Sequence, residues 1–358
     1  MITKYQIDML NVGDADAFVV YYETNHTQKH LVLIDAGRYG DGEHVLHHLN
    51  TYYGGIPVEL AIVTHPDDDH YGGFVYLLEQ IQSKRPHAVG INMFWLNDPR
   101  RHIFIDDVEE AMQRTTLERR LNEIYALNDT NLVEQIESMG IPHQEAFART
   151  YERLHASPLG TYPFPECCSS EQEGFIILGP TKSYYKEQCK NFRYEHVHVA
   201  ACESDADVID RADFAETATC LSRVLDEAED DNSNHNRSSI IVLFEPEYGK
   251  RYLFTGDASV DSFENMTITH RMRCKHLRWL KVPHHGSKHN LNSKWIKYFS
   301  PKTAYISTLK RGQYLNQCVV NALKKIECKV ISTHNNADFG YIVHENILNR
   351  NLGEVNYC

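Results

Sequence analysis

Residues 58–70 join an apolar segment directly to a cluster of residue types that bind metals. The segment VELAIVTH has the composition of a buried strand, and PDDDH then adds Asp67, Asp68, Asp69 and a second histidine. Adjacent carboxylates repel one another, so a surface loop gains little from such a run. The crowding is explained if a cation binds there. Because GGFVYLLEQIQ (72–82) has helical character, we expect a strand, a ligand loop and a helix in immediate succession.

Three other predicted strands carry His or Asp at one end. RYLFTGD ends at Asp257, LRWLKVP is followed by two histidines, and His235 lies shortly before the strand predicted in SSIIVLF. Polar side chains at strand ends gather at one edge of a sheet, where functional loops commonly lie. This ordered set predicts a metal site. The candidates are His65, Asp67, Asp69, His70, His235, Asp257, His284 and His285.

The 358-residue chain is long for one domain and short for three. We expect strands at YQIDMLNVG, AFVVYYE and HLVLIDAG, and an alternation of helix and strand from SKWIKYF to CKVIST. Residues 98–230 are mostly polar and helix-forming, although FIILG within them reads as a strand. The sequence therefore predicts a single domain over residues 1–358, in which 98–230 form a mostly helical insertion or cap.

Membrane association and export are not expected. No apolar run approaches the roughly 20 residues that a membrane span needs, and the opening MITKYQIDML has no signal-peptide core. The nine cysteines are scattered and contain no C-x-x-C pair. That pattern suits a reducing compartment better than a disulfide framework or a zinc ribbon. These features predict a cytoplasmic protein.

The formal net charge of −13 is unevenly distributed. Residues 265–326 contain no Asp or Glu but thirteen Lys and Arg residues. Such asymmetry can create one positive face on an acidic protein. We expect the basic block at 271–311 to contact nucleic acid, because phosphate contacts supply most non-specific affinity for nucleic acids. The alternative is a set of solvated basic helices without a partner.

Four segments together resemble the metallo-β-lactamase superfamily, and within it the hydrolase domain of ComEC-type DNA-uptake proteins and their stand-alone relatives. They are NVGDADAF, HPDDDHYGG, LFTGD and LKVPHHGSKHN. HPDDDH resembles the superfamily signature H-x-H-x-D-H, with Asp67 in place of the second histidine. The resemblance covers about residues 5–36, 57–76 and 236–308. It implies an α/β fold, the αββα metallo-β-lactamase sandwich, with a helical insertion.

The resemblance also implies two divalent metal ions. His65 and Asp67 would bind one ion, Asp69 and His70 the other, and Asp257 would bridge them. A hydroxide held between the ions would attack the substrate, since a metal lowers the pKa of bound water from about 16 to about 7. The carboxylate in place of an imidazole at Asp67 favours Mn²⁺, with Zn²⁺ as the alternative.

Other assignments leave alternatives open. HNRSSI lies under the superfamily pattern G-H-T-x-G-S-I and places a ligand at His235, but ComEC-type sequences tend to have asparagine there, and Asn236 is adjacent. VPHHG places the last ligand at His285, with His284 supporting it or facing the substrate, although the two roles are exchangeable. Asp35, in LIDAG, matches a position that braces the metal loop by hydrogen bonds.

The predicted catalytic residues are Asp69, which could orient the nucleophile, His284 and Lys288. Lys288 and the neighbouring His289 are candidates for a phosphate contact or a leaving-group acid, or are ordinary surface residues. Simpler roles also exist for Asp67–Asp69 as a helix cap, for Asp257 in a turn and for His235 in a solvated loop.

The favoured function is hydrolysis of phosphodiesters, with DNA or another nucleic acid as the substrate. One alternative is hydrolysis of a small ester, lactone or phosphate diester, because a fold does not determine the substrate. Another is a metal-stabilised interaction module in which residues 98–230 bind a partner protein.

Overall fold

The computed structural model describes residues 2–25, 27–102, 128–148, 174–190, 192, 218–309, 314–333 and 340–345. Much of the expected insertion at 98–230 lies outside these residues. No helix in the described ranges has both the length and the apolar character of a transmembrane span.

The first sheet is built mainly from the N-terminal part of the chain. Its strands lie in the order β13 (Tyr341–His344), β1 (Ile2–Leu10), β2 (Ala17–Thr24), β3 (Gln28–Ala36), β4 (Leu60–Ile62), β5 (Phe94–Trp95) and β6 (His143–Gln144). From β13 to β3 the pairs are antiparallel, and from β3 to β6 they are parallel. The strands expected at YQIDMLNVG, AFVVYYE and HLVLIDAG are confirmed as β1 to β3.

The second sheet is built mainly from the C-terminal part. Its strands lie in the order β12 (Lys329–Ser332), β11 (Thr303–Ile306), β10 (Trp279–Lys281), β9 (Lys250–Phe254), β8 (Ile241–Glu247) and β7 (Phe175–Gly179). Strands β9 to β12 pair in parallel, and β7 to β9 are antiparallel. The expected strand FIILG is confirmed as β7. Because β6 and β7 both come from residues 98–230, this stretch also supplies an edge strand to each sheet.

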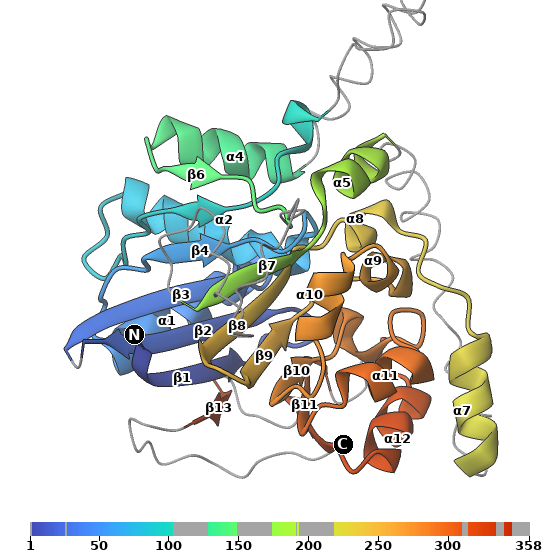
Figure 1. Ribbon diagram of the computed structural model, residues 1–358. Helices are drawn as coiled ribbons and strands as arrows, with labels where there is room; N and C mark the ends of the chain where they lie inside the picture. The colour runs from blue at the N-terminus through green and yellow to red at the C-terminus, as the bar shows by residue number, and fades with distance from the viewer. Residues whose placement is uncertain are drawn as a thin grey trace, which may run out of the picture.

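Helices cover the outer face of each sheet (Figure 1). The first sheet packs against α1 (Gly42–Tyr53), α2 (Asp68–Gln82) and α4 (Asn128–Ser138). The second packs against α7 (Ala218–Glu227), α9 (Val260–Glu264), α10 (Ile268–Arg273), α11 (Ser293–Phe299) and α12 (Gln317–Lys325). The remaining helices, α5 (Lys182–Cys189) and the one-turn α8 (Asn234–Arg237), lie above β7 and β8 in the view of Figure 1.

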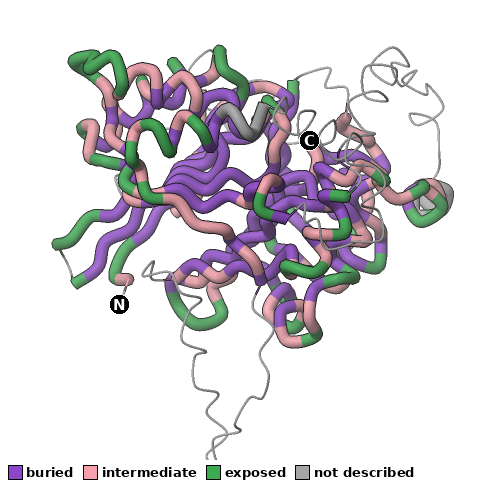
Figure 2. Tube along the Cα trace, turned by 90° about the horizontal axis from the view of Figure 1, so that it is seen from above, coloured by how far each residue is buried: buried purple, intermediate pink, exposed green. Residues whose placement is uncertain are grey.

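The inner faces of the two sheets form a third apolar layer rich in aromatic rings. Tyr5 meets Phe244 edge to face at 5.8 Å between ring centroids, and Phe18 meets Phe254 at 5.3 Å. Buried strands therefore run through the middle of the molecule, with exposed segments at the loops and outer helix faces (Figure 2). This order of layers confirms the predicted αββα sandwich.

Candidate metal site

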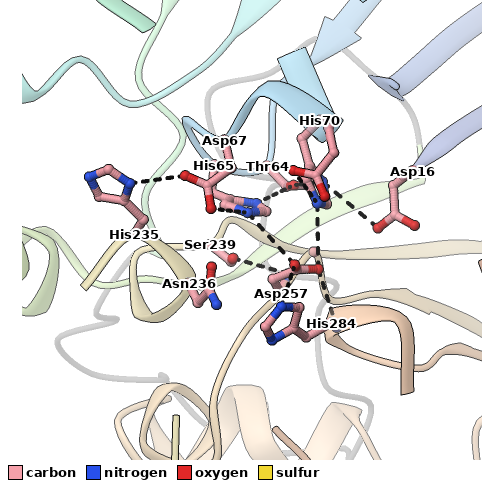
Figure 3. A network of polar contacts seen from close by, with 12 residues as sticks. Asp16, Thr64, His65, Asp67, His70, His235, Asn236, Ser239, Asp257 and His284 are labelled. Atoms are coloured by element: carbon pink, nitrogen blue, oxygen red, sulfur yellow. Dashed lines mark hydrogen bonds and ion pairs between the residues drawn. The ribbon is translucent and has the colours of Figure 1, made fainter. Parts of the chain in front are cut away.

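The predicted ligands come from loops that follow strands in both sheets. His65 follows β4, Asp257 follows β9, and His284 and His285 follow β10. Neighbouring parallel strands end at the same edge of a sheet, so these loops converge. Figure 3 shows the side chains meeting where the two sheets end.

Helix α2 begins inside the aspartate run, four residues earlier than expected from GGFVYLLEQIQ. Asp67 occupies the N-cap position but makes no side-chain capping bond. Its carboxylate instead accepts a hydrogen bond from His235 Nδ1 at 2.9 Å and lies 3.6 Å from His65 Nε2. Asp69 and His70 are in the first turn, so the helix directs them toward the sheet edge. The carboxylate of Asp67 is thus not used as a helix cap.

Gly72 and Gly73, at which the expected helix begins, lie within α2. A Cβ atom on Gly73 would lie 2.0 Å from the carbonyl oxygen of Ala36. A Cβ atom on Gly72 would lie 2.5 Å from the backbone nitrogen of Tyr39. Glycine is needed at both positions because any side chain would push the start of α2 away from the end of β3.

Three buried imidazoles and two aspartates form the centre of the site. Ligand atoms of His65, His70 and Asp257 lie within 4.8 Å of one another, as do those of Asp69, His70 and His285. The Nε2 atoms of the three histidines have no hydrogen-bond partner among the described residues. Burying such atoms without a partner is costly. A metal ion would satisfy all three, so these residues fit the ligand set of a metal.

Asp257 presents its two oxygens to different surroundings. Oδ1 accepts hydrogen bonds from Lys281 Nζ and the backbone nitrogen of His284, both at 3.2 Å. Oδ2 lies 3.9 Å from His65 Nε2 and 3.7 Å from His285 Nε2. The protein therefore fixes Oδ1, which His70 Nε2 also approaches at 3.5 Å, and directs Oδ2 toward His65 and His285.

Asp35 braces the ligand loop, as predicted. Its carboxylate accepts hydrogen bonds from the backbone nitrogen and Oγ1 of Thr64 at 2.8 and 2.7 Å. It also lies 2.8 Å from His70 Nδ1, which leaves Nε2 of that ring facing Asp257 at 3.5 Å. A carboxylate on the remote nitrogen of a ligating histidine fixes the ring orientation and raises its basicity.

His285 lies in the central cluster and His284 at its margin. His285 Nδ1 lies 3.2 Å from the carbonyl oxygen of Ser307, and its Nε2 lies 3.3 Å from Asp69 Oδ2. His284 Nδ1 is held by Asn290 at 3.0 Å, and its Nε2 lies 3.8 Å from Asp257 Oδ2. Both histidines have left-handed backbone conformations, with φ of 45° and 52°. Such strain in non-glycine residues is typical of functional sites.

In the segment HNRSSI, the neighbouring side chains of His235 and Asn236 contact different parts of the site. His235 contacts Asp67 and lies outside the clusters of converging ligand atoms found in the described chain. Asn236 donates from Nδ2 to Asp231 Oδ2 at 2.7 Å. Asp231 also lies 3.3 Å from His284 Nδ1, so the motif supports His284 through this carboxylate.

Sequence reasoning missed a buried charge network under the cluster. Lys281 Nζ contacts Asp16 and donates to the carbonyl oxygen of Gly256 at 2.8 Å. Asp16 in turn accepts a hydrogen bond from Ser307 Oγ. The side chains of Lys281 and Asp16 are both fully buried. Lys281 is therefore a central counter-ion of the site and adds nothing to a positive surface.

The site favours positive charge. Burial raises the pKa of Asp257, but Lys281 and the nearby histidines outweigh burial and hold that pKa well below its usual range. Burial lowers the pKa of His284, but Asp257 and Asp231 raise it to about 9. The carboxylates thus stabilise cations among them, as a divalent ion requires.

Comparison with known proteins agrees with this geometry. Residues 11–141 match the family model of the metallo-beta-lactamase superfamily. This part of the chain is similar to members of that superfamily. Over 136 residues the chain is 28% identical to ComE operon protein 3 of Bacillus subtilis (strain 168). That match spans 37% of this chain and 17% of the Bacillus protein.

Two solved structures of hydrolases are similar to most of this chain. Igni18, a metallo hydrolase from Ignicoccus hospitalis KIN4/I, is 10% identical, with 95% of this chain and 99% of Igni18 covered and a TM-score of 0.39. The hydrolase AbOPH of the beta lactamase superfamily is 9% identical, with 93% and 88% covered and a TM-score of 0.32.

The basic block at 271–311 presents fewer free cations than its sequence suggests. Lys281 is buried, and Lys310 and Arg311 lie outside the described residues. Four cations form ion pairs with glutamates outside the block: Arg271 and Lys294 with Glu264, Arg273 with Glu245, and Arg278 with Glu345.

The side chains of Lys288 and His289 lie outside the central cluster. In the described part of the chain, the Lys288 ammonium makes no polar contact with the cluster, and its backbone nitrogen donates to Asn316 Oδ1 at 2.7 Å. His289 Nδ1 lies 2.8 Å from the carbonyl oxygen of Glu229. Neither side chain contacts a predicted metal ligand among the described residues, so any role of Lys288 or His289 in catalysis requires a substrate that extends to them.

Proposed function

We propose that this chain is a metal-dependent hydrolase that uses two divalent ions to cleave phosphodiesters. The observation that carries the proposal is the convergence of three buried imidazole nitrogens on the carboxylates of Asp257 and Asp69, with no hydrogen-bond partner for those nitrogens among the described residues. A site built only for stability would pair such nitrogens.

Two overlapping groups of ligands support a pair of ions. Asp69, His70 and His285 would hold one ion, and His65 with Asp67 would hold the other. Asp257 would be shared between the two ions. The second group is the smaller, because the His235 ring contacts Asp67 and lies away from the cluster. We therefore expect the ion at Asp69 and His285 to bind more tightly.

The ions would lower the pKa of a coordinated water and stabilise charge on the phosphoryl oxygens. The chain's own residues do the positioning. Asp35 fixes the His70 ring, Ser307 fixes the His285 ring, and Lys281 fixes Asp257. Asp69, partly exposed beside His285, lies where it can orient the attacking group.

The metal content provides a direct test. We expect two ions per chain and faster hydrolysis of bis(para-nitrophenyl) phosphate with Mn²⁺ than with Zn²⁺. The reason is that Asp67 places a carboxylate where the superfamily signature has a histidine, and oxygen ligands favour Mn²⁺. Elemental analysis of protein reloaded with each metal, together with steady-state rates, measures both. Binding of no more than one ion, or a clear preference for Zn²⁺, would contradict the proposal.

Nucleic acid is the substrate that we propose within this class. The sequence resemblance to DNA-uptake hydrolases supports it. The ion pairs within the basic block and the net charge of −13 favour a smaller phosphodiester instead. The two substrates differ in how many phosphates contact the protein, and salt dependence measures that number.

Binding to single-stranded DNA should weaken by roughly 0.7 log units per phosphate contact for each tenfold rise in salt. Lys288→Ala should lower this slope by about one contact and raise the KM for DNA. Lys294→Ala should lower it less, because that ammonium already contacts Glu264. Fluorescence anisotropy across a salt series measures the slope.

Hydrolysis of a small diester serves as the control in the same variants. It should stay within about twofold of wild type, since neither Lys288 nor Lys294 contacts the central cluster in the described part of the chain. Cleavage of the small diester without detectable binding of DNA would favour the small-substrate alternative.

A further inference from the structure

Arg38 stands at the solvent side of the metal cluster. It follows β3 and precedes α1, and its side chain is 46% exposed. Its Nη2 atom lies 3.6 Å from Asp69 Oδ2, the same oxygen that His285 Nε2 approaches at 3.3 Å. An exposed guanidinium is therefore adjacent to a predicted metal ligand.

Two hydrogen bonds hold Arg38 in place, one from its backbone nitrogen and one from Nη1 of its guanidinium. Its backbone nitrogen donates to Asp41 Oδ2 at 2.8 Å, and Nη1 donates to the carbonyl oxygen of Asp14 at 2.8 Å. Asp14 is itself fixed, because its carboxylate accepts hydrogen bonds from Thr308 Oγ1 and the backbone nitrogen of Leu309. The guanidinium is thus anchored without using most of its donors.

The remaining donors of Arg38 are free for a ligand. Nη2 is beyond hydrogen-bond distance of Asp69, and within the described ranges neither Nε nor Nη2 has a hydrogen-bond acceptor. A guanidinium presents five N–H groups in a planar fork that matches two oxygens of a phosphate. An arginine that served only to neutralise Asp69 would gain more from a direct hydrogen bond to that carboxylate.

We propose that Arg38 binds the anionic oxygens of the substrate and so selects phosphodiesters over neutral esters. The proposal rests on the hydrolase function proposed above and names the residue that determines its substrate class. The Arg38 side chain would lose little conformational entropy on binding an anion, because its guanidinium is already held by the hydrogen bond to Asp14.

The test compares Arg38→Met and Arg38→Lys with wild type. Three quantities are measured on full-length, Mn²⁺-loaded protein: the KM and kcat for bis(para-nitrophenyl) phosphate, the same constants for neutral para-nitrophenyl acetate, and the Kd of inorganic phosphate by calorimetry. Arg278→Met is the matched control. Arg278 is 41% exposed, contacts Glu345 at 3.3 Å and precedes β10 at the strand end opposite the cluster.

Arg38→Met should raise the KM for the diester and the Kd of phosphate by about 10- to 100-fold, the range for a lost charge-assisted hydrogen bond. The constants for the acetate ester and the number of bound metal ions should stay unchanged. Arg38→Lys should recover part of the loss, because an ammonium keeps the charge without the fork. Arg278→Met should behave as wild type.

Equal losses on both esters, or an unchanged phosphate Kd in Arg38→Met, would overturn the proposal. So would a several-fold gain in metal affinity without any change toward phosphate, since Arg38 would then only neutralise Asp69. If the wild-type protein hydrolyses no diester, the function proposed above fails. The phosphate Kd of the metal-loaded variants still decides the role of Arg38 in that case.

Discussion

Asp257→Ala should reduce metal-dependent diester hydrolysis to below a few per cent of wild type. Among the described residues, Asp257 is the carboxylate that His65, His70 and His285 all approach, at 3.9, 3.5 and 3.7 Å. Its loss would leave the two ions without a shared ligand. The double change Asp69→Ala/His70→Ala should have the same effect, because it removes two of the three ligands in the group that contains His285. Steady-state rates and elemental analysis of the purified variants measure turnover and metal content together.

A matched aspartate variant separates this effect from general damage. Asp261→Ala, in α9, removes a carboxylate that contacts Tyr184 and lies outside the cluster. It should keep turnover within about twofold of wild type. Circular dichroism should show that all three variants retain the fold, since none of the replaced side chains belongs to the apolar layers. Activity above a few per cent in Asp257→Ala would refute the two-ion mechanism.

Local patterns in the sequence predicted most of the fold. SKWIKYF forms α11 with the expected ends, and FIILG forms β7, because their hydrophobic periodicity matches the element that they adopt. The start of α2 was less predictable. Its first turn carries Asp68, Asp69 and His70, and such polar residues are typical of loops as well as of helix N-termini. The four-residue β13 carries too short a pattern to identify without its partner β1.

The residues of the central cluster were predictable because each lies at or just after the end of an apolar segment. Apart from Asp35, their supporting residues were not. Asp16 and Lys281 are 265 positions apart in the sequence, and only the packing of the two sheets brings them together. Lys281 also lies among many other cations, so charge counting placed it on a surface. The choice between His235 and Asn236 depends on the rotation of the one-turn helix α8, which adjacent residues in a sequence do not reveal.

In the last motif, the predicted position of the ligand, His285, is the histidine that lies in the central cluster. VPHHG allows either histidine to be the ligand, and the left-handed turn at His284 and His285 sends only the second ring into the central cluster. Spacing identified the motif, but backbone conformation decides which ring enters the cluster. Arg38 could not be identified from the sequence either. It lies in a loop without a recognisable motif, and only the structure shows that its guanidinium is close to Asp69.

Lys281→Met should destabilise the metal-free protein by about 3–5 kcal/mol, the range for removing one partner of a buried ion pair. The ammonium is fully buried, and it contacts Asp16, Asp257 and the carbonyl oxygen of Gly256. Methionine preserves much of the side-chain length and apolar volume, so the loss would report mainly on charge. Chemical unfolding of the chelator-treated protein in urea, with unchanged m-values, measures the free energy of unfolding.

A second variant tests whether charge is the cause. Asp16→Asn/Lys281→Met removes both charges of the innermost pair, and the amide oxygen that replaces the carboxylate can still accept the hydrogen bond from Ser307. The double variant should recover part of the lost stability, because no uncompensated carboxylate remains at residue 16. Adding Mn²⁺ should stabilise Lys281→Met more than wild type, since a bound cation would replace the missing ammonium beside Asp257. If the single variant loses less than about 1 kcal/mol, or the double variant is the less stable of the two, Lys281 acts through packing and the buried charge network does not hold this site together.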